Sequence, residues 1–192
     1  MEKGIKSLSM DDIARDLHVS KKTLYQICDN KPDLVKLVMQ FQMDCDKKRS
    51  VEFAQDALDA VHEIILVMKS VTEHMRTLNP ITLNDIQRYY PESWEVFKSF
   101  RFEFVYHKML ANLTRGVKEG VYRKSLNPDI IARLYVAAID NLFNPQLFPA
   151  HDYYFVDVYR QFLEYHLRGI ATARGIDLIE NYSVTEKKLP DK

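Results

Sequence analysis

The stretch that decides the fold is Ser9-Met10-Asp11-Asp12-Ile13-Ala14-Arg15-Asp16-Leu17-His18-Val19-Ser20-Lys21-Lys22-Thr23-Leu24-Tyr25. Ser9 and Ser20 are favourable N-cap residues, and each precedes a short run with helical spacing. The acids after Ser9 suit the first turn of a helix, where the helix dipole favours negative charge. The stretch therefore predicts two short helices joined by a tight turn. His18 lies in that turn, where we expect a left-handed backbone conformation.

Two helices this short must bury a few apolar side chains against each other. The side chains with suitable spacing are Ile13, Ala14, Leu17, Val19, Leu24 and Ile27. The outer face of the second helix then carries two cations, a hydroxyl, a phenol and an amide, namely Lys21, Lys22, Thr23, Tyr25 and Gln26. Such groups at a helix N-terminus bind phosphates and base edges. This helix-turn-helix pattern indicates DNA binding, with an ordinary solvated helix face as the alternative.

The composition is typical of a helical cytoplasmic protein. The 192 residues include 27 Lys and Arg and 27 Asp and Glu, a balance that excludes a broad basic surface but allows a small DNA-binding one. The longest apolar run, residues 134–139, is too short to span a membrane, and no secretory signal is visible at the start. Cys28 and Cys45 lie outside any zinc-binding spacing and fit a reducing compartment. With 5 Gly and 7 Pro, long helices are favoured over sheets.

The rest of the chain also reads as helical, so we expect an all-α fold. The expected elements are a helix from residue 30, helices over 51–75, 91–119, 128–143 and 152 to about 169–175, and a short element over 83–90. Asn79-Pro80 is expected to end the 51–75 helix, and Gly120 the 91–119 helix. The expected domains are a DNA-binding module over 1–45, a larger helical domain over 46–182 and a polar tail over 183–192.

The quoted stretch, continued to Lys31-Pro32-Asp33-Leu34, resembles the DNA-binding module of TetR-type transcriptional regulators. A weaker similarity covers residues 89–94 and 116–123. The resemblance implies DNA contacts by Ser9, Ser20, Lys21, Lys22, Thr23, Tyr25 and Lys31. Among these, Ser9 and Lys31 would anchor phosphates, and Tyr25 would contact a phosphate or a thymine.

The sequence departs from that family at two places. Ile27 and Cys28 replace a phosphate-binding residue and a core aromatic. The family also has a full helix before the motif, of which only residues 1–4 could be a remnant. Either the chain begins at an internal residue or the module is truncated.

The resemblance also implies that the larger domain binds a small molecule. In TetR-like proteins, the helix that corresponds to residues 91–119 lines a ligand cavity. The candidate ligand contacts are Met68, His74, Met75, Phe100, Arg101, Phe104 and His107. Arg101, Glu103 and His107 are expected to be embedded in this apolar helix, where they could orient a polar part of the ligand. Aromatic and thioether walls suit an apolar or flat aromatic effector with one polar end. The alternative is a packed central helix on which Glu103 and His107 pair at the surface.

Two apolar stripes near the end of the chain resemble an association surface. The first is Ile131, Leu134, Tyr135, Ala138 and Leu142, and the second is Phe155, Tyr159, Phe162, Leu163, His166 and Ile170. The resemblance implies that both stripes form a four-helix homodimer interface. The alternative is that they only close the core of their own chain.

Signatures of catalysis are thin in this sequence. His62-Glu63 begins like a zinc-protease motif, but Leu66 stands where the second histidine is needed. A Gly-rich phosphate loop and a nucleophile elbow are both missing. We therefore expect no enzymatic activity, no metal and no cofactor.

The sequence as a whole predicts a homodimeric, ligand-responsive repressor that binds a two-half-site operator in duplex DNA. The alternative is a helical ligand-binding or interaction protein with an incomplete DNA-binding module.

Overall fold

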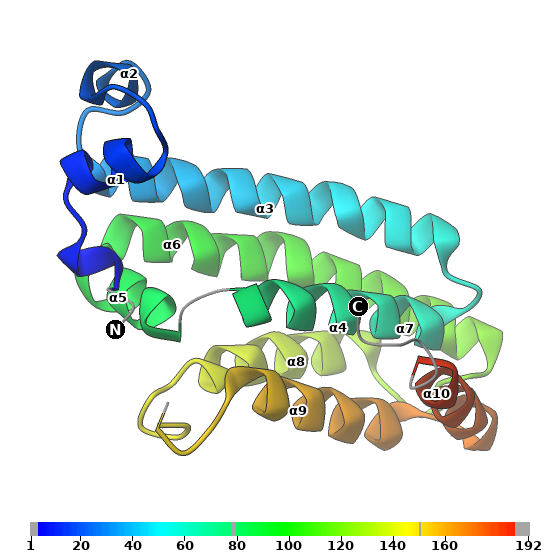
Figure 1. Cartoon of the computed structure of the whole chain (residues 1–192). Coiled ribbons are helices and arrows are strands. Elements are labelled where there is room, and N and C mark those ends of the chain that lie inside the picture. Colours follow the sequence, from blue (N-terminus) through cyan, green and yellow to red (C-terminus); the bar gives the residue numbers. More distant parts are fainter. Residues whose placement is uncertain (1–3, 78–79, 150, 187–192) are drawn as a thin grey trace. The chain divides into compact units, whose positions relative to one another are not determined.

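The computed structural model describes residues 4–77, 80–149 and 151–186. The expected all-α fold is confirmed, because every named element in these ranges is helical (Figure 1). The elements, with η1 a 3-10 helix and η2 a π-helix, are η1 Ile5–Ser7, α1 Met10–Asp16, α2 Lys21–Tyr25, α3 Lys31–Asp56, α4 Ala60–Thr77, α5 Pro80–Tyr89, α6 Pro91–Phe100, η2 Arg101–Val105, α7 Tyr106–Glu119, α8 Pro128–Leu142, α9 Phe155–Ile170 and α10 Ala173–Glu186.

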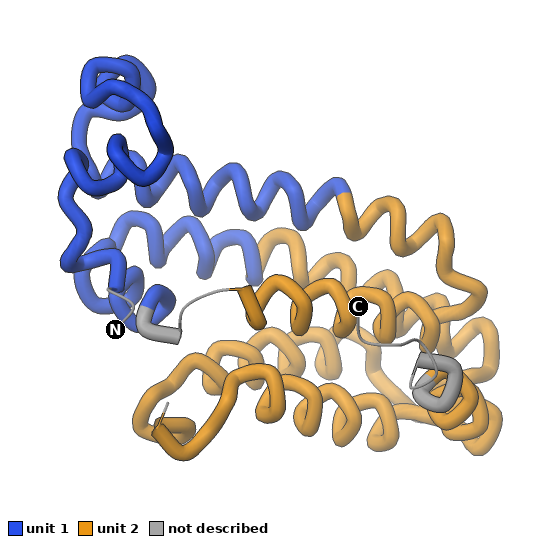
Figure 2. Tube along the Cα trace, in the orientation of Figure 1, with its two compact units in different colours: residues 1–48, 78–101 blue, residues 49–77, 102–192 orange. Residues whose placement is uncertain are grey.

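The chain divides into two compact units (Figure 2). Unit 1 contains residues 1–48 and 78–101, and unit 2 contains residues 49–77 and 102–192. The sequence-based boundary at residue 45 had placed residues 78–101 in the second domain. They join unit 1 because α5 packs beside η1. The Lys6 amide donates a 2.9 Å hydrogen bond to the buried carboxylate of Asp85, and the Lys6 ammonium lies 4.1 Å from the centre of the Tyr89 ring.

The predicted helix pair is present in unit 1 as α1 and α2. Its buried core is Met10, Ala14, Leu24 and Cys28. Three side chains expected in this core are exposed instead: Leu17 at 60%, Val19 at 38% and Ile27 at 63%. Helical spacing failed for these residues because α1 ends at Asp16 and α2 ends at Tyr25, so all three lie outside the regular helices.

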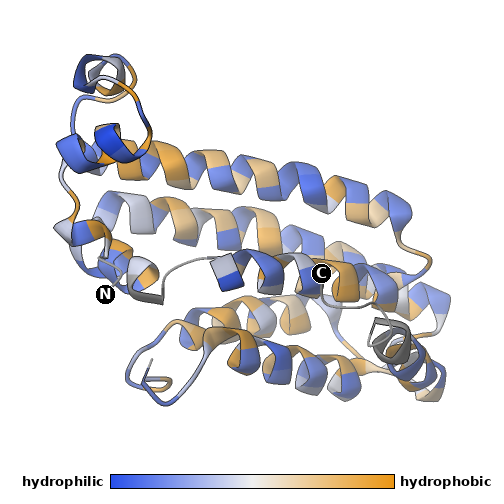
Figure 3. Ribbon diagram, in the orientation of Figure 1, coloured by the Kyte–Doolittle hydropathy of each residue, from blue (hydrophilic) through white to orange (hydrophobic). Residues whose placement is uncertain are grey.

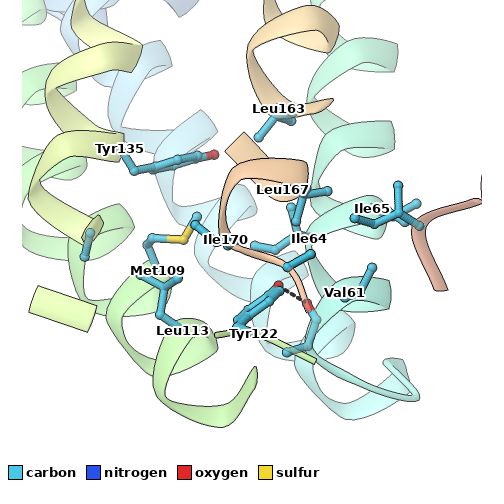
Figure 4. Close-up of a cluster of buried hydrophobic side chains, with 14 of the residues drawn as sticks. Val61, Ile64, Ile65, Met109, Leu113, Tyr122, Tyr135, Leu163, Leu167 and Ile170 are labelled. Atoms are coloured by element: carbon cyan, nitrogen blue, oxygen red, sulfur yellow. Dashed lines mark hydrogen bonds between the residues drawn. The ribbon is translucent and has the colours of Figure 1, made fainter. Parts of the chain in front are cut away.

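The core of unit 2 is built from α4, α7, α8, α9 and α10. Each of these helices contributes buried apolar side chains, and apolar and polar residues alternate along the ribbons (Figure 3). Val61, Ile64 and Ile65 of α4 are buried in the same core as Met109 and Leu113 of α7 (Figure 4). Burial of these side chains supplies the main stabilising term of the unit.

A polar group completes this core at one end. The buried Tyr122 hydroxyl lies 3.1 Å from both the Ala60 carbonyl oxygen and the Asn112 side-chain oxygen. Asn112 in turn donates to Ala60 and to Glu63, each at 2.9 Å. Burial raises the pKa of Tyr122 well above its usual value. The hydroxyl therefore stays protonated and can serve this network as a donor.

One expectation about the end of the chain is wrong. The helix expected to stop near residues 169–175 is α9, and it ends at Ile170 as expected. It is not the last helix, because α10 follows from Ala173 to Glu186. Gly175 lies inside α10, and a Cβ there would come within 2.2 Å of the Val121 carbonyl oxygen. This glycine thus permits close packing and does not end a helix. The polar tail expected from residue 183 is helical as far as residue 186, and residues 187–192 lie outside the described range.

Two other expected helix boundaries differ from the structure. The helix predicted over 51–75 is split, because α3 continues to Asp56 and α4 begins at Ala60. The Asp59 carboxylate accepts the His62 amide at 2.9 Å and so caps the start of α4. The predicted end of this helix at Asn79 lies outside the described residues. The last loop also extends further than expected, since α9 begins at Phe155 and not at residue 152.

The long helix expected over 91–119 is present as α6, η2 and α7 in continuous succession. It ends at Gly120, whose φ of 75° is left-handed, as the sequence predicted. Its centre is a π-helical turn, Arg101–Val105, which the sequence pattern did not reveal. The helix is not buried on every side, since Phe102 and Glu103 are exposed.

Candidate nucleic-acid interface and ligand-contact residues

Ser9 begins α1 with a complete capping box. Its hydroxyl accepts the Asp12 amide at 3.1 Å, and the Asp12 carboxylate accepts the Ser9 amide at 3.0 Å. Hydrogen bonds from Ser9, and then from Arg15, lower the pKa of Asp12 to about 2. The Ser9 hydroxyl is thus already engaged with α1. Its predicted contact with a DNA phosphate remains a prediction.

Ser20 caps the start of α2 with its side chain. Its hydroxyl accepts the Thr23 amide at 3.0 Å and lies 2.8 Å from the Thr23 hydroxyl. The preceding turn places His18 at a φ of 55°, which confirms the left-handed residue expected there. The two caps and this turn fix where α2 starts and therefore which of its side chains face outward.

The predicted DNA-reading face of α2 is accessible. Lys21, Lys22, Thr23 and Tyr25 are all exposed, while Leu24 is buried against α1. Lys21 does not stand alone, because its ammonium lies 2.8 Å from the Asp11 carboxylate on α1. Sequence reasoning missed Asp11 as a partner of Lys21, since their ten-residue separation spans a helix, a turn and a new helix.

Lys31, predicted to anchor a phosphate, already makes hydrogen bonds within unit 1. Its ammonium donates to the carbonyl oxygens of Lys6 at 3.1 Å and Leu8 at 2.5 Å. Two of its three donor hydrogens are therefore used inside unit 1. Lys31 ties the segment before α1 to the start of α3, and its role toward DNA stays a prediction.

The predicted ligand contacts fall in both units. In unit 1, Phe100 is half-buried, and the buried Arg101 guanidinium lies 4.4 Å from the Phe97 ring centre and 5.5 Å from that of Trp94. In unit 2, four of the predicted side chains are partly buried, namely Met68, His74, Met75 and Phe104.

His107, the remaining predicted ligand contact, was expected to be embedded beside Glu103. Both side chains are exposed, and the His107 ring nitrogen Nδ1 lies 2.5 Å from the backbone oxygen of Glu103. The expectation of embedded polar groups on this helix is therefore wrong for these two residues and holds for Arg101.

The two stripes of the expected association surface divide between core and surface. Tyr135, Leu142, Tyr159, Leu163 and Ile170 are buried in the core of unit 2. Beside them on α8 and α9, Leu134 is 60% exposed, Ile130 53% and Tyr165 79%. Most of both stripes is therefore buried in the core of their own chain. Ile130, Leu134 and Tyr165 remain as an exposed apolar margin.

Metal-binding clusters and membrane spans are both missing from the described residues. Among them, no group of three or more His, Cys, Asp or Glu side chains could hold a metal ion. No helix in that part of the chain combines the length and apolarity needed to cross a membrane.

Comparison with known proteins points to the same region as the sequence motif. A family model described as the CENP-B N-terminal DNA-binding domain matches residues 2–38, which contain α1 and α2. A relative from Bacillus subtilis (strain 168), described as the uncharacterized HTH-type transcriptional regulator YvaF, is 24% identical over 177 residues, and the match covers 92% of each chain.

Solved structures of regulators share the fold over most of the chain. A transcriptional regulator from Cytophaga hutchinsonii ATCC 33406 matches with a TM-score of 0.70 and 17% identity, over 88% of this chain and 91% of that chain. The transcriptional regulator FadR from Bacillus subtilis, in complex with stearoyl-CoA, matches with a TM-score of 0.60 and 18% identity, over 86% of this chain and 90% of that chain. The chain therefore has the fold of helical transcriptional regulators, as its resemblance to the TetR type implied.

Proposed function

We propose that this protein is a ligand-responsive transcriptional repressor that reads duplex DNA with α2. The observation that carries the proposal is the accessible polar face of α2, whose start is set by Ser20 and whose opposite side is buried through Leu24. Lys22 and Thr23 would contact base edges in a major groove, and Lys21, Tyr25, Ser9, Ser20 and Lys31 would contact phosphates or bases. A protein of this kind would act in the cytoplasm, where its operator is found.

The test is duplex binding by the full chain across a range of salt concentrations. A preferred site is first selected from random duplexes. Lys22→Ala is expected to change the preferred sequence, whereas Lys31→Ala is expected to weaken binding to all sequences and to flatten the salt dependence by about one charge. Lys118→Ala, at an exposed position of α7 in unit 2, is the matched control and should change neither. Wild-type protein without any salt-dependent duplex binding would refute the proposal.

We propose further that two chains associate through α8 and α9 to read two half-sites. The exposed margin of Ile130, Leu134 and Tyr165 supports this, because an apolar surface of this kind is a frequent site of association. Leu134→Glu is expected to yield monomers, since a charge would be buried without a partner. Leu58→Glu, at another exposed apolar position of unit 2, should leave the assembly intact. Wild-type protein that sediments as a monomer at micromolar concentration would contradict the dimer.

The effector is proposed to be an apolar molecule with one polar end. The relative with stearoyl-CoA bound suggests this chemistry, and Met68, His74, Met75 and Phe104 offer partly buried apolar or aromatic surface in unit 2. Phe100, Arg101 and His107 remain predicted contacts. To work as an inducer, the ligand must bind the DNA-free state more tightly than the DNA-bound state.

The probe for this proposal is stearoyl-CoA, with binding measured by thermal shift. Phe104→Ala is expected to weaken binding about tenfold, the effect of losing part of one aromatic contact. Phe102→Ala is the matched control, since Phe102 lies two residues away and is largely exposed. Equal stabilisation of both variants and the wild type would show that Phe104 does not contact the ligand.

A second candidate function is a helical interaction protein whose helix-turn-helix contacts another protein. The exposed Leu17 and Ile27 side chains favour it, because they form apolar surface beside α2. Leu17→Ser would weaken such a protein contact and leave duplex binding unchanged. A loss of duplex binding in Leu17→Ser without unfolding would instead place this surface in the DNA complex.

A further inference from the structure

The ion pair between Asp11 and Lys21 joins the two helices of the helix-turn-helix. Asp11 is in the first turn of α1, Lys21 is the first residue of α2, and their charged groups are 2.8 Å apart. The hydrogen bond that the Lys21 ammonium donates to the Asp11 carboxylate is the main reason that the pKa of Lys21 is raised. The ammonium on the reading helix is thus held by a neighbouring helix before any DNA arrives.

This pair is not needed for packing. Both side chains are largely exposed, at 54% for Lys21 and 66% for Asp11, and exposed ion pairs add little to stability. The neighbouring carboxylate of Asp12 is occupied by the capping box and by Arg15, which leaves Asp11 to meet Lys21. Lys22, one position along α2, has no ion-pair partner among the described residues. Of the two lysines on the DNA-reading face, Lys21 therefore has a carboxylate beside its ammonium and Lys22 does not.

A tethered lysine beside a carboxylate behaves differently toward DNA from a free one. Lysine is a flexible point charge that is attracted to any phosphate. A nearby carboxylate repels phosphates and so weakens binding to every sequence alike. At a correct site, the restricted ammonium can donate to a base edge with less loss of side-chain freedom. Specificity is a difference between affinities, so weakening the non-specific complex raises it.

We propose that Asp11 is a specificity-determining residue, which positions Lys21 for base contact and opposes sequence-independent binding to DNA. This inference rests on the proposed function, because it assumes that α2 reads duplex DNA. Asp11 acts through Lys21 and is a positioning residue.

The experiment compares the affinities of the full chain for a selected duplex and for a scrambled duplex of equal composition. Asp11→Asn is expected to tighten binding to the scrambled duplex about fivefold, roughly the effect of one unit charge at contact distance in water. The selected duplex should change less, because the gain is offset by the lost positioning of Lys21. The ratio of the two affinities should therefore fall about threefold to fivefold.

Two matched variants separate positioning from plain charge removal. Asp16→Asn removes one exposed carboxylate from the same helix and should shift both affinities equally, leaving their ratio unchanged. In a Lys21→Gln background, Asp11→Asn should no longer change the ratio. Asp11→Ser repeats the test with a different side chain, and circular dichroism checks that each variant is folded.

The outcomes distinguish this inference from the proposed function. If Asp11→Asn changes the ratio no more than Asp16→Asn does, or changes it equally without Lys21, Asp11 has no positioning role although the protein still reads DNA. If the wild type shows no salt-dependent duplex binding, the proposed function is wrong, and the role of Asp11 is wrong with it.

Discussion

The helix-turn-helix of unit 1 and the bundle of unit 2 are stabilised in different ways. The first has a small core of Met10, Ala14, Leu24 and Cys28, and its helices begin at the serine caps of residues 9 and 20. The second buries side chains from five helices, with Leu113 and Leu163 fully enclosed. Local hydrogen bonds thus contribute a larger share of the stability in the helix-turn-helix, and long-range apolar packing a larger share in the bundle.

The largest expected effect on stability comes from removing a buried side chain from the core of unit 2. Leu163→Ala should lower the free energy of unfolding by about 3 kcal/mol, because it leaves a cavity where the side chain is fully buried. Leu17→Ala, at an exposed position of the helix-turn-helix, should change it by less than about 0.5 kcal/mol. Urea denaturation followed by circular dichroism measures both. Equal losses of unfolding free energy in the two variants would refute the proposed difference in how the two regions are stabilised.

A pH effect is expected in the bundle at His166, whose ring lies 5.0 Å from that of Tyr135 and 6.0 Å from that of Phe162. Burial lowers the pKa of His166 from 6.5 to about 4. Because the unfolded state then binds the proton more readily, stability is intact above pH 6.5 and falls as the pH drops toward 4. The loss should reach at most about 3 kcal/mol.

Matched substitutions test the origin of this pH effect. His166→Asn should remove the pH dependence between 6.5 and 4, as measured by thermal unfolding. His18→Asn, in the exposed turn of the helix-turn-helix, should retain it, and asparagine tolerates the left-handed backbone there. An unchanged pH profile in His166→Asn would assign the effect to another group.

A smaller effect is expected where α7 approaches Tyr122. A Cβ at Gly116 would lie 2.1 Å from the buried Tyr122 ring, so Gly116→Ala should cost about 2 kcal/mol through overpacking. Nothing lies within 4 Å of a Cβ at Gly169. Gly169→Ala should therefore stabilise α9 by about 0.5 kcal/mol. Both changes are measurable as shifts in the urea midpoint, and destabilisation by both would show that helix-end effects dominate over packing.

The smallest effect concerns the cap of α1. Ser9→Ala should cost α1 about 1 kcal/mol, measured by faster hydrogen exchange of its amides, while Ser125→Ala in unit 2 leaves them unchanged. Because the pKa of Asp12 is lowered to about 2, mainly by Ser9, its contribution is present above pH 4 and disappears as the pH falls toward 2. In Ser9→Ala this loss should be smaller and should be complete at a higher pH, because the pKa of Asp12 in the folded state then lies closer to its unfolded value. Unchanged exchange would mean that the cap does not limit the opening of α1.

Much of the candidate DNA-reading face could be predicted from the sequence. The capping serines, the left-handed His18 and the outward residues of α2 depend on neighbours within about four positions. The inner face was predicted less well. Leu17 and Ile27 were assigned to the core by helical spacing, which does not apply beyond the ends of α1 and α2. The ligand contacts were inferred from the resemblance and from ionisable residues set within an apolar helix, and His107 proved to be exposed.

The sequence by itself determined the all-α class, the starts of α1 and α2, and the end of α7 at Gly120, because each depends on local hydrogen bonding and backbone preference. Only the tertiary structure decided which distant groups meet. It placed residues 78–101 in unit 1, engaged the Lys31 ammonium with backbone carbonyls, and put Gly175 inside a helix against Val121. The reason is that these contacts join residues far apart in the chain. The spacing of residues along the sequence predicts only contacts between near neighbours in the chain.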